Sequence, residues 1–207
     1  MSSLTTLTPE RYQQGVAELT AREPVFQRIL QAYGVPPLWA REPGFATLVK
    51  IILEQQVSLA SAAAAFRKLH ELVSPVTPQG FLTLDDASLK AAGFSRQKTA
   101  YSRHLAHALL ERSLDLDALP GMTVEQVRAA LTSVKGIGRW TADIYLLMVL
   151  LHADTWPRGD LALAKAAKDA LQLDALPDDD RLDALAEAWQ PWRAVAARFL
   201  WHYYLST

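Results

Sequence analysis

The sequence predicts an all-α protein. Apolar residues recur at three- and four-residue spacing along most of the 207 residues, which is the period of an amphipathic helix. Prolines and glycines fall between these periodic stretches, where helices begin and end. No stretch alternates apolar and polar residues in the way a convincing strand does. The chain is therefore expected to build its core from helices alone.

Prolines, glycines and N-capping residues set the expected helix bounds. We expect helices over residues 10–21, 24–33, 84–92, 96–113, from about 124, from about 139, and over 161–171, 178–190 and 191–205. Residues 44–73 carry the longest helical pattern, but Glu54-Gln55-Gln56 interrupts it and Ser58 can cap a new helix, so this stretch admits two helices with a turn near 56–58. Pro75 and Pro78 indicate a loop.

The stretch Leu131–Asp160 combines a tight turn with a lone acid. Gly136-Ile137-Gly138 separates two helical patterns, the first of which starts with the capping box Thr123 and Gln126. After the second pattern comes a loop, and Asp160 follows at the expected N-cap of the next helix. Each feature alone has a plain structural interpretation, a helix connection and a capping residue.

Composition excludes several kinds of site. The chain has no cysteine, so disulfides and cysteine-ligated iron–sulfur clusters are excluded. Its five histidines form no ligand set with metal spacing, so a metal held by side chains is not expected. No apolar run is long enough to span a membrane, and the segment MSSLTTLTPERYQQ lacks the features of a secretion signal. We expect a cytoplasmic protein of one large domain or two small lobes.

The charge is nearly balanced, at −1 with a pI of about 6.5. Taken alone this argues mildly against nucleic-acid binding, because phosphate contacts need lysine and arginine. Many of the acidic residues, however, lie within residues 174–183. Basic residues gather around the stretch described above: Lys135, Arg139, Arg158, Lys165 and Lys168. A neutral protein can still present a local basic face of this kind.

The glycine turn suits contact with a phosphate. Glycines let the backbone approach another surface, Ile137 can pack between the helices, and the amides at the start of the next helix point outward with the helix dipole behind them. The hairpin residues expected at a DNA backbone are Lys135, Gly136, Ile137, Gly138 and Arg139.

Four motifs together resemble one family. They are LVKIILEQQVSLASA at 48–62, GFSRQK at 93–98, VKGIGRWTAD followed by PRGD at 134–160, and WQPWR with a later Trp201. In this order they resemble the helix–hairpin–helix (HhH-GPD) DNA glycosylases, in particular the alkylated-base glycosylases of the AlkA type. The resemblance implies a two-lobed helical fold without the N-terminal β-sheet lobe of larger members. One lobe would hold the N- and C-terminal helices, and the other, about 55–155, the hairpin at 123–152.

The resemblance implies that Asp160 is the catalytic aspartate. Breaking the bond from a damaged base to deoxyribose C1′ places positive charge on the sugar, which a fixed carboxylate stabilises. Trp140 stands where related oxidised-base enzymes carry a Schiff-base lysine. The resemblance therefore implies a monofunctional enzyme that leaves an abasic site, because no lysine nucleophile is present there.

The resemblance also implies the residues around an extruded base. Gln56 matches the residue that wedges into the vacated stack, although family wedges are often apolar. The base pocket would be lined by Trp140, Trp201, Gln55, Ile144 and Leu161. Two of these, Ile144 and Leu161, replace tyrosines of the family, so the pocket is expected to be less aromatic. Plain alternatives are solvated glutamines at a helix end and tryptophans in the core.

In the family, hairpin carbonyls hold a monovalent cation that bridges to phosphate. By position these carbonyls are those of Thr132, Val134 and Ile137, so the resemblance implies a possible Na⁺ or K⁺ site and no required cofactor. The implied function is base excision repair as a DNA-3-methyladenine glycosylase II, on 3-methyladenine, 7-methylguanine or ethenoadenine in double-stranded DNA, by a monomer. Alternatives are a non-enzymatic helix–hairpin–helix DNA-binding module and a helical scaffold for protein partners.

Overall fold

The computed structural model describes residues 5–207, so residues 1–4 of the segment inspected for a secretion signal lie outside it. Within this range the chain is helical and has no strand, apart from an isolated bridge between Thr6 and His152. The prediction of an all-α fold is confirmed. None of the described helices is long and apolar enough to cross a membrane.

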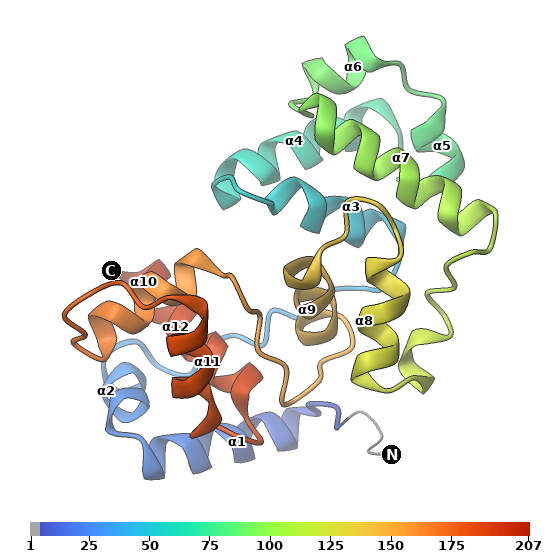
Figure 1. Cartoon of the computed structure of the whole chain (residues 1–207). Helices are drawn as coiled ribbons and strands as arrows, with labels where there is room; N and C mark the ends of the chain where they lie inside the picture. Colours follow the sequence, from blue (N-terminus) through green and yellow to red (C-terminus); the bar gives the residue numbers. More distant parts are fainter. Residues whose placement is uncertain (1–4) are drawn as a thin grey trace. The chain divides into compact units, whose positions relative to one another are not determined.

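The chain divides into two compact units (Figure 1). The terminal unit holds the residues up to Ala40 together with Leu146–Thr207, and the central unit holds Arg41–Tyr145. The central unit thus begins earlier than the expected residue 55, because α3 (Phe45–Glu54) packs against α4 (Leu59–Leu72) and α7 (Arg96–Leu110). It also ends earlier than the expected residue 155, within α9 (Arg139–Met148).

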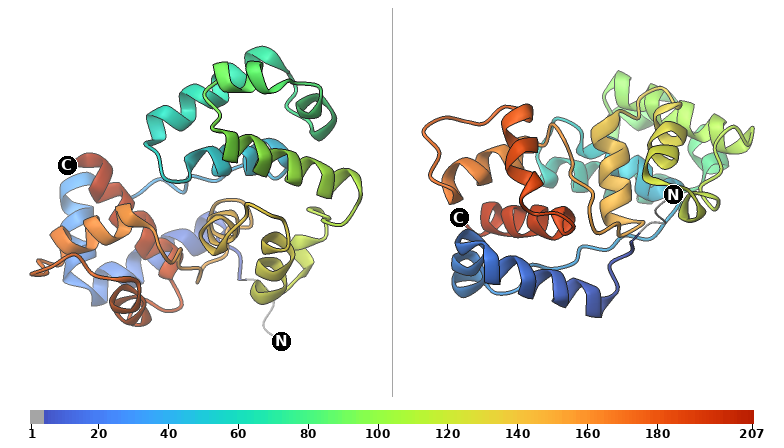
Figure 2. Two further views of the ribbon diagram at one scale, coloured as in Figure 1. Left: turned by 45° about the horizontal axis from the view of Figure 1, so that its top comes forward. Right: turned by 60° about the horizontal axis from the view of Figure 1, so that its bottom comes forward.

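The terminal unit is built around its last helix, α12 (Arg193–Ser206). Its neighbours are α1 (Pro9–Arg22), α2 (Pro24–Tyr33), α10 (Leu161–Ala170) and α11 (Asp179–Glu187). All residues from Ala194 to Trp201 are buried, as expected for a helix surrounded on every side. The right-hand view of Figure 2 shows α12 lying along α1.

One arginine lies inside this core. The guanidinium of Arg198 is fully buried and donates to three carbonyls, those of Leu38 at 2.7 Å, Ala194 at 2.9 Å and Leu147 at 2.7 Å. Burial lowers the pKa of Arg198 to about 10. Arg198 thereby holds together three segments of the terminal unit, because each carbonyl loses its donor if the side chain is removed.

The central unit has its core along α3, α4 and α7. The buried residues of α3 are Phe45, Leu48, Val49, Ile51, Ile52 and Leu53. Two short helices, α5 (Pro78–Leu82) and α6 (Asp86–Ala91), pack against α7, and a 3₁₀ turn at Leu119–Gly121 leads to α8 (Val124–Thr132). α5 lies in the expected loop, since Thr77 caps a helix there and Pro78 suits its first position.

Candidate functional site

Asp160 is a buried carboxylate at the start of α10. It is 9% exposed, and its Oδ1 accepts from the backbone N–H of Leu163 at 2.9 Å, which confirms the predicted N-cap. The same oxygen accepts from Nε1 of Trp201 at 3.3 Å. Two donors at the N-terminal end of a helix thus fix the position of the carboxylate. Such a group can stabilise positive charge that develops beside it.

The loop that leads to Asp160 is fixed at several points. Trp156 is buried, with its ring edge-on to Trp189 at 5.5 Å. Asp154 accepts from the guanidinium of Arg193 at 2.9 and 2.8 Å. The position of Asp160 is therefore determined by the terminal unit around it and does not depend on the capping bond alone.

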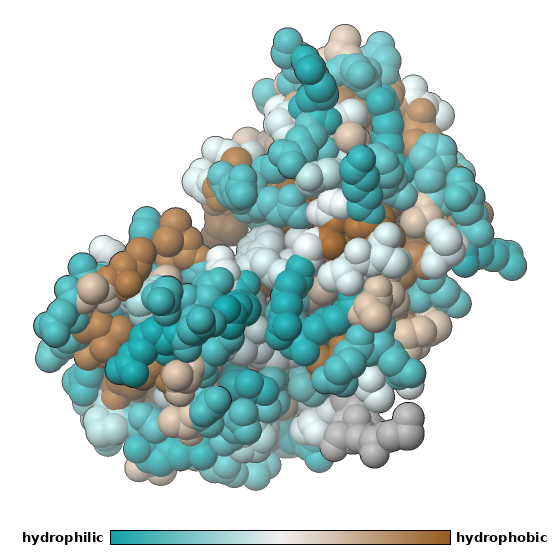
Figure 3. Space-filling model, in the orientation of Figure 1, coloured by the Kyte–Doolittle hydropathy of each residue, from teal (hydrophilic) through white to brown (hydrophobic). Residues whose placement is uncertain are grey.

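Arg158 forms ion pairs with aspartates of α11 (Asp179–Glu187). Its guanidinium donates to Asp180 at 2.6 Å and to Asp183, and it lies 3.8 Å from Asp179. All three carboxylates belong to α11, over which hydrophilic side chains gather in Figure 3. The prediction that Arg158 adds to a basic face is wrong, because the carboxylates of the acidic segment 174–183 neutralise its charge.

The hairpin lies in the central unit, between α8 and α9. The capping box of Thr123 and Gln126 is confirmed. Ile137 is buried, and its N–H donates to the carbonyl of Val134 at 3.0 Å. Gly136 has φ +102°, and a Cβ there would lie 2.1–2.5 Å from atoms of the Tyr101 side chain. Only glycine fits at this turn.

The charges of the hairpin differ in their surroundings. Lys135 is exposed. Arg139 is 59% exposed and lies 3.3 Å from Asp143, a fully buried carboxylate that Arg128 also contacts, at 2.7 Å. Burial raises the pKa of Asp143, and the two arginines oppose that rise. Sequence analysis missed Asp143, although its spacing of four residues from Arg139 on a helix was a readable signal.

The predicted wedge follows α3. Gln56 is exposed and has φ +55°, a backbone conformation that residues other than glycine seldom adopt. Gln55, directly before it, is half-buried, and its Nε2 donates to the carbonyl of Gly136 at 3.0 Å and to Oγ1 of Thr141 at 2.9 Å. The contact between Gln55 and the hairpin is not one that sequence analysis expected.

The residues predicted to line a base pocket divide between the units. In the central unit Trp140 and Gln55 are half-buried and Ile144 is buried. In the terminal unit Leu161 is 58% exposed, and Trp201 is 8% exposed and bonded to Asp160. The structure thus brings Trp201 to the catalytic candidate, and it brings Gln55 to the hairpin.

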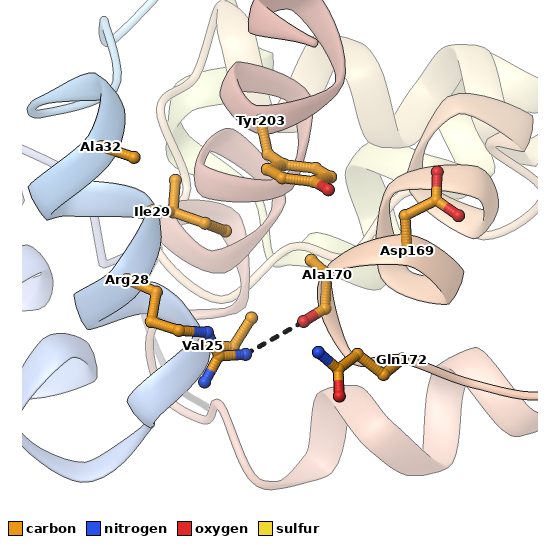
Figure 4. Close-up of a pocket in the computed structure, with 8 residues that line it drawn as sticks. All are labelled: Val25, Arg28, Ile29, Ala32, Asp169, Ala170, Gln172 and Tyr203. Atoms are coloured by element: carbon orange, nitrogen blue, oxygen red, sulfur yellow. Dashed lines mark hydrogen bonds between the residues drawn. The ribbon is translucent and has the colours of Figure 1, made fainter.

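The terminal unit also contains a cavity away from Asp160. Between residues 5 and 207 no three histidine, aspartate or glutamate side chains converge as a metal site. A cavity of about 200 Å³ in the terminal unit is lined by Val25, Arg28, Ile29, Ala32, Asp169, Ala170, Gln172 and Tyr203 (Figure 4). It lies at the end of α10 opposite Asp160, about 15 Å away for a helix of this length.

The comparison with protein families decides the assignment. Residues 49–192 match the model of the HhH-GPD superfamily of base excision DNA repair proteins. The chain belongs to this superfamily. The matched residues contain both the hairpin and Asp160, so the resemblance drawn from the four motifs is confirmed at the level of the HhH-GPD family.

Individual relatives within the HhH-GPD superfamily cover most of the chain. A Bacillus subtilis protein, YfjP, provisionally named a DNA-3-methyladenine glycosylase, is 28% identical over 181 residues, which are 84% of this chain and 63% of that protein. DNA-3-methyladenine glycosylase 2 of Escherichia coli is 32% identical over 167 residues, 74% of this chain and 55% of the relative. The chain therefore spans less than two thirds of the length of these two HhH-GPD relatives.

A solved structure supports the HhH-GPD fold. The Schizosaccharomyces pombe 3-methyladenine DNA glycosylase Mag1, determined in complex with abasic DNA, superimposes with a TM-score of 0.85 at 24% identity. The match covers 91% of this chain and 95% of Mag1. At this identity the likeness establishes the fold, and the activity is a separate question.

Proposed function

We propose that this protein is a monofunctional DNA glycosylase that releases alkylated purines from double-stranded DNA. The observation that carries the proposal is the buried carboxylate of Asp160, which is fixed by Leu163 and Trp201 within an HhH-GPD chain. The exposed cap Asp178 of α11 accepts from a backbone N–H, whereas Asp160 is buried and accepts from an indole N–H as well. The names of the relatives point to 3-methyladenine as the first substrate to test.

The reaction needs little from the protein beyond charge and position. The bond from C1′ to the base nitrogen breaks, and its electron pair leaves with the base, so that a cationic 3-methylated adenine departs as a neutral molecule. Asp160 stabilises the positive charge left on the sugar. Water adds to C1′ and gives up a proton, which leaves an abasic site. Trp140 offers no amine, so no covalent sugar–enzyme intermediate forms.

The remaining proposed roles follow the same scheme. Trp140 and Trp201 present indole faces that attract a cationic base by about 0.5–2 kcal/mol. The amides of the hairpin, with Lys135 and Arg139 beside them, bind the DNA backbone, and Gln56 enters the stack. A Na⁺ or K⁺ ion on the carbonyls of Thr132, Val134 and Ile137 would bridge to a phosphate. 7-Methylguanine, which is also cationic, extends the proposed range by the same step. Ethenoadenine is neutral, so its departing base must also take up a proton, which the water that adds to C1′ gives up. The protein acts as a monomer in the cytoplasm.

The test is base release from duplexes that contain 3-methyladenine or ethenoadenine, followed by alkali to reveal abasic sites. Asp160→Asn keeps the size and capping ability of the side chain but removes its charge, and it should lower the rate roughly 10²–10³-fold. Asp178→Asn is the matched control, because Asp178 caps α11 through the N–H of Arg181 in the same way, at 2.9 Å. This control should release base at the wild-type rate.

Other outcomes would favour other functions. Salt-sensitive duplex binding without release of any alkylated purine would support the second candidate, a non-enzymatic DNA-binding module, which the hairpin alone explains. Strand cleavage without alkali, together with trapping by borohydride, would contradict the proposal of a monofunctional enzyme. Binding that is insensitive to salt would oppose both DNA functions and favour a scaffold for proteins.

A further inference from the structure

The side chain of Gln55 joins two predicted DNA-contacting elements of the central unit. Its Nε2 donates to Gly136, in the hairpin turn, and to Thr141, in the first turns of α9. The carbonyl of Gly136 can only accept, so the amide must present its nitrogen there. Both N–H bonds of the amide are thus engaged within the protein. A role for Gln55 as a donor to a base is not compatible with this arrangement.

Gly136, which carries this acceptor, also packs against α7. Tyr101 of α7 packs against Gly136 so closely that a Cβ there would lie 2.1 Å from the ring carbon Cγ. α7 also holds α3, since Nζ of Lys98 donates to the carbonyl of Leu53 at 2.6 Å. The hairpin turn and the end of α3 are therefore both attached to α7, and Gln55 connects them directly to each other.

The turn that Gln55 begins contains the wedge candidate. Gln56 has φ +55°, and three residues after Gln55 the side chain of Ser58 caps α4 by accepting from the N–H of Ser61 at 3.2 Å. A non-glycine residue holds such a backbone conformation only where its surroundings impose it. Gln55 on one side and Ser58 on the other supply that constraint. Release of Gln55 would let the turn relax and change the direction of the Gln56 side chain.

We propose that Gln55 is a positioning residue that keeps the wedge turn in register with the hairpin. This inference rests on the proposed function. With Gln55 in place, binding of the DNA backbone by the hairpin fixes where Gln56 meets the base stack. Backbone binding and insertion of Gln56 therefore occur together. Without it the hairpin still binds phosphate, but insertion is no longer aligned with it. Gln55 acts through Gln56 and does not contact the base.

The experiment is a double-mutant cycle between Gln55→Met and Gln56→Ala. Methionine keeps the length of the side chain but cannot donate. The substrate is a duplex with ethenoadenine beside 2-aminopurine, whose fluorescence rises when it unstacks. Loss of two hydrogen bonds should reduce single-turnover base release roughly tenfold and lower the fluorescence rise. In the Gln56→Ala background the added effect of Gln55→Met should stay within about twofold, because the shared function is already lost.

Three controls separate this role from a structural one. Gln55→Met should leave the salt dependence of binding to undamaged duplex near wild type, and its unfolding temperature should fall only moderately, so that the protein stays folded at the assay temperature. Thr141→Val removes one of the two acceptors and should give a smaller loss of the same kind. Gln14→Met is the matched substitution at an exposed glutamine of α1, where the amide donates to Glu18 at 2.9 Å, and should have no effect on release.

The outcomes are distinct. Independent, multiplicative effects of Gln55→Met and Gln56→Ala would overturn the proposal. So would a loss that differs strongly between ethenoadenine and 3-methyladenine, since that is expected of a residue that lines the base pocket. If the wild type releases neither base, the proposed function fails, while the fluorescence cycle on bound DNA still decides whether Gln55 controls insertion.

Discussion

The two units differ in net charge and in whether their candidate functional groups are exposed or buried. The central unit has 12 lysines and arginines against 10 aspartates and glutamates, and the terminal unit has 9 against 12. The central unit presents backbone amides and exposed side chains at the hairpin and at Gln56, whereas the terminal unit buries one carboxylate, Asp160, at a fixed position. The proposed attraction to phosphate and the proposed stabilisation of a cation need opposite charges, and the residues proposed for them lie in separate units.

This difference between the units explains why the overall charge of −1 is a poor indicator of nucleic-acid binding. Much of the acid of the terminal unit is matched internally, as in the pairs of Arg158 with α11 and of Arg193 with Asp154.

Gly136→Ala should disrupt the central unit most. The new Cβ would meet Tyr101 and the backbone has positive φ, so the free energy of unfolding should fall by about 2–4 kcal/mol. Chemical denaturation measures this loss, and duplex binding should weaken with it. Gly138→Ala is the control, because nothing lies within 4 Å of a Cβ at Gly138. Equal losses in both variants would mean that Tyr101 does not constrain the turn.

Arg158→Gln should act on the terminal unit alone. Three carboxylates of α11 lose their cation, and because the pairs are exposed to solvent the loss of stability should be small. Base release should slow a few-fold, because the loop before Asp160 is less firmly held. The salt dependence of duplex binding should not change.

Arg181→Gln is the matched control for Arg158→Gln, as it removes an exposed positive charge from α11 itself. A slope of binding against salt that falls by about one in Arg158→Gln would show that this arginine meets a phosphate after all.

Glu18→Gln should have the smallest effect. The carboxylate of Glu18 accepts from Nε1 of Trp192 at 2.6 Å, and this bond, followed by that from Gln14, lowers the pKa of Glu18 below its ordinary 4.5. A lowered pKa in the folded state means that the contribution of Glu18 to stability is present above pH 4.5 and is lost as the pH falls through the folded pKa. The difference in unfolding temperature between wild type and Glu18→Gln should therefore be found at pH 7 and should vanish at lower pH. A difference that is constant with pH would contradict this account.

The sequence predicted most of what is local. The capping box at Thr123 and the N-cap role of Asp160 depend on residues within four positions of one another, and both are confirmed. The predicted helices are present as well, although their ends differ from the predicted ones by up to three residues, as at Leu110 of α7 and Glu187 of α11. The helix of residues 78–82 was taken for a loop because Pro75 and Pro78 suggested a break, although Pro78 starts the helix.

Contacts between distant residues escaped prediction. Gln55 meets Gly136 across 81 positions, Trp201 meets Asp160 across 41, and Arg158 meets Asp180 across 22. Periodicity shows which face of a helix is buried but not which partner covers it. For this reason the catalytic candidate could be named from the motifs, while the donor that holds it and the anchor of its loop needed the structure.

The order of the two units along the chain has a consequence for biogenesis. The central unit is one continuous segment, so it can fold as soon as it leaves the ribosome. The terminal unit is assembled from both ends of the chain around α12, and Gly15 of α1 lies so close to Trp192 that a Cβ there would be 2.9 Å from its ring. The Trp201 that holds Asp160 belongs to α12 as well. During synthesis the hairpin would therefore fold before the carboxylate is in place, so a nascent chain would hold its proposed DNA-binding element before its proposed catalytic one.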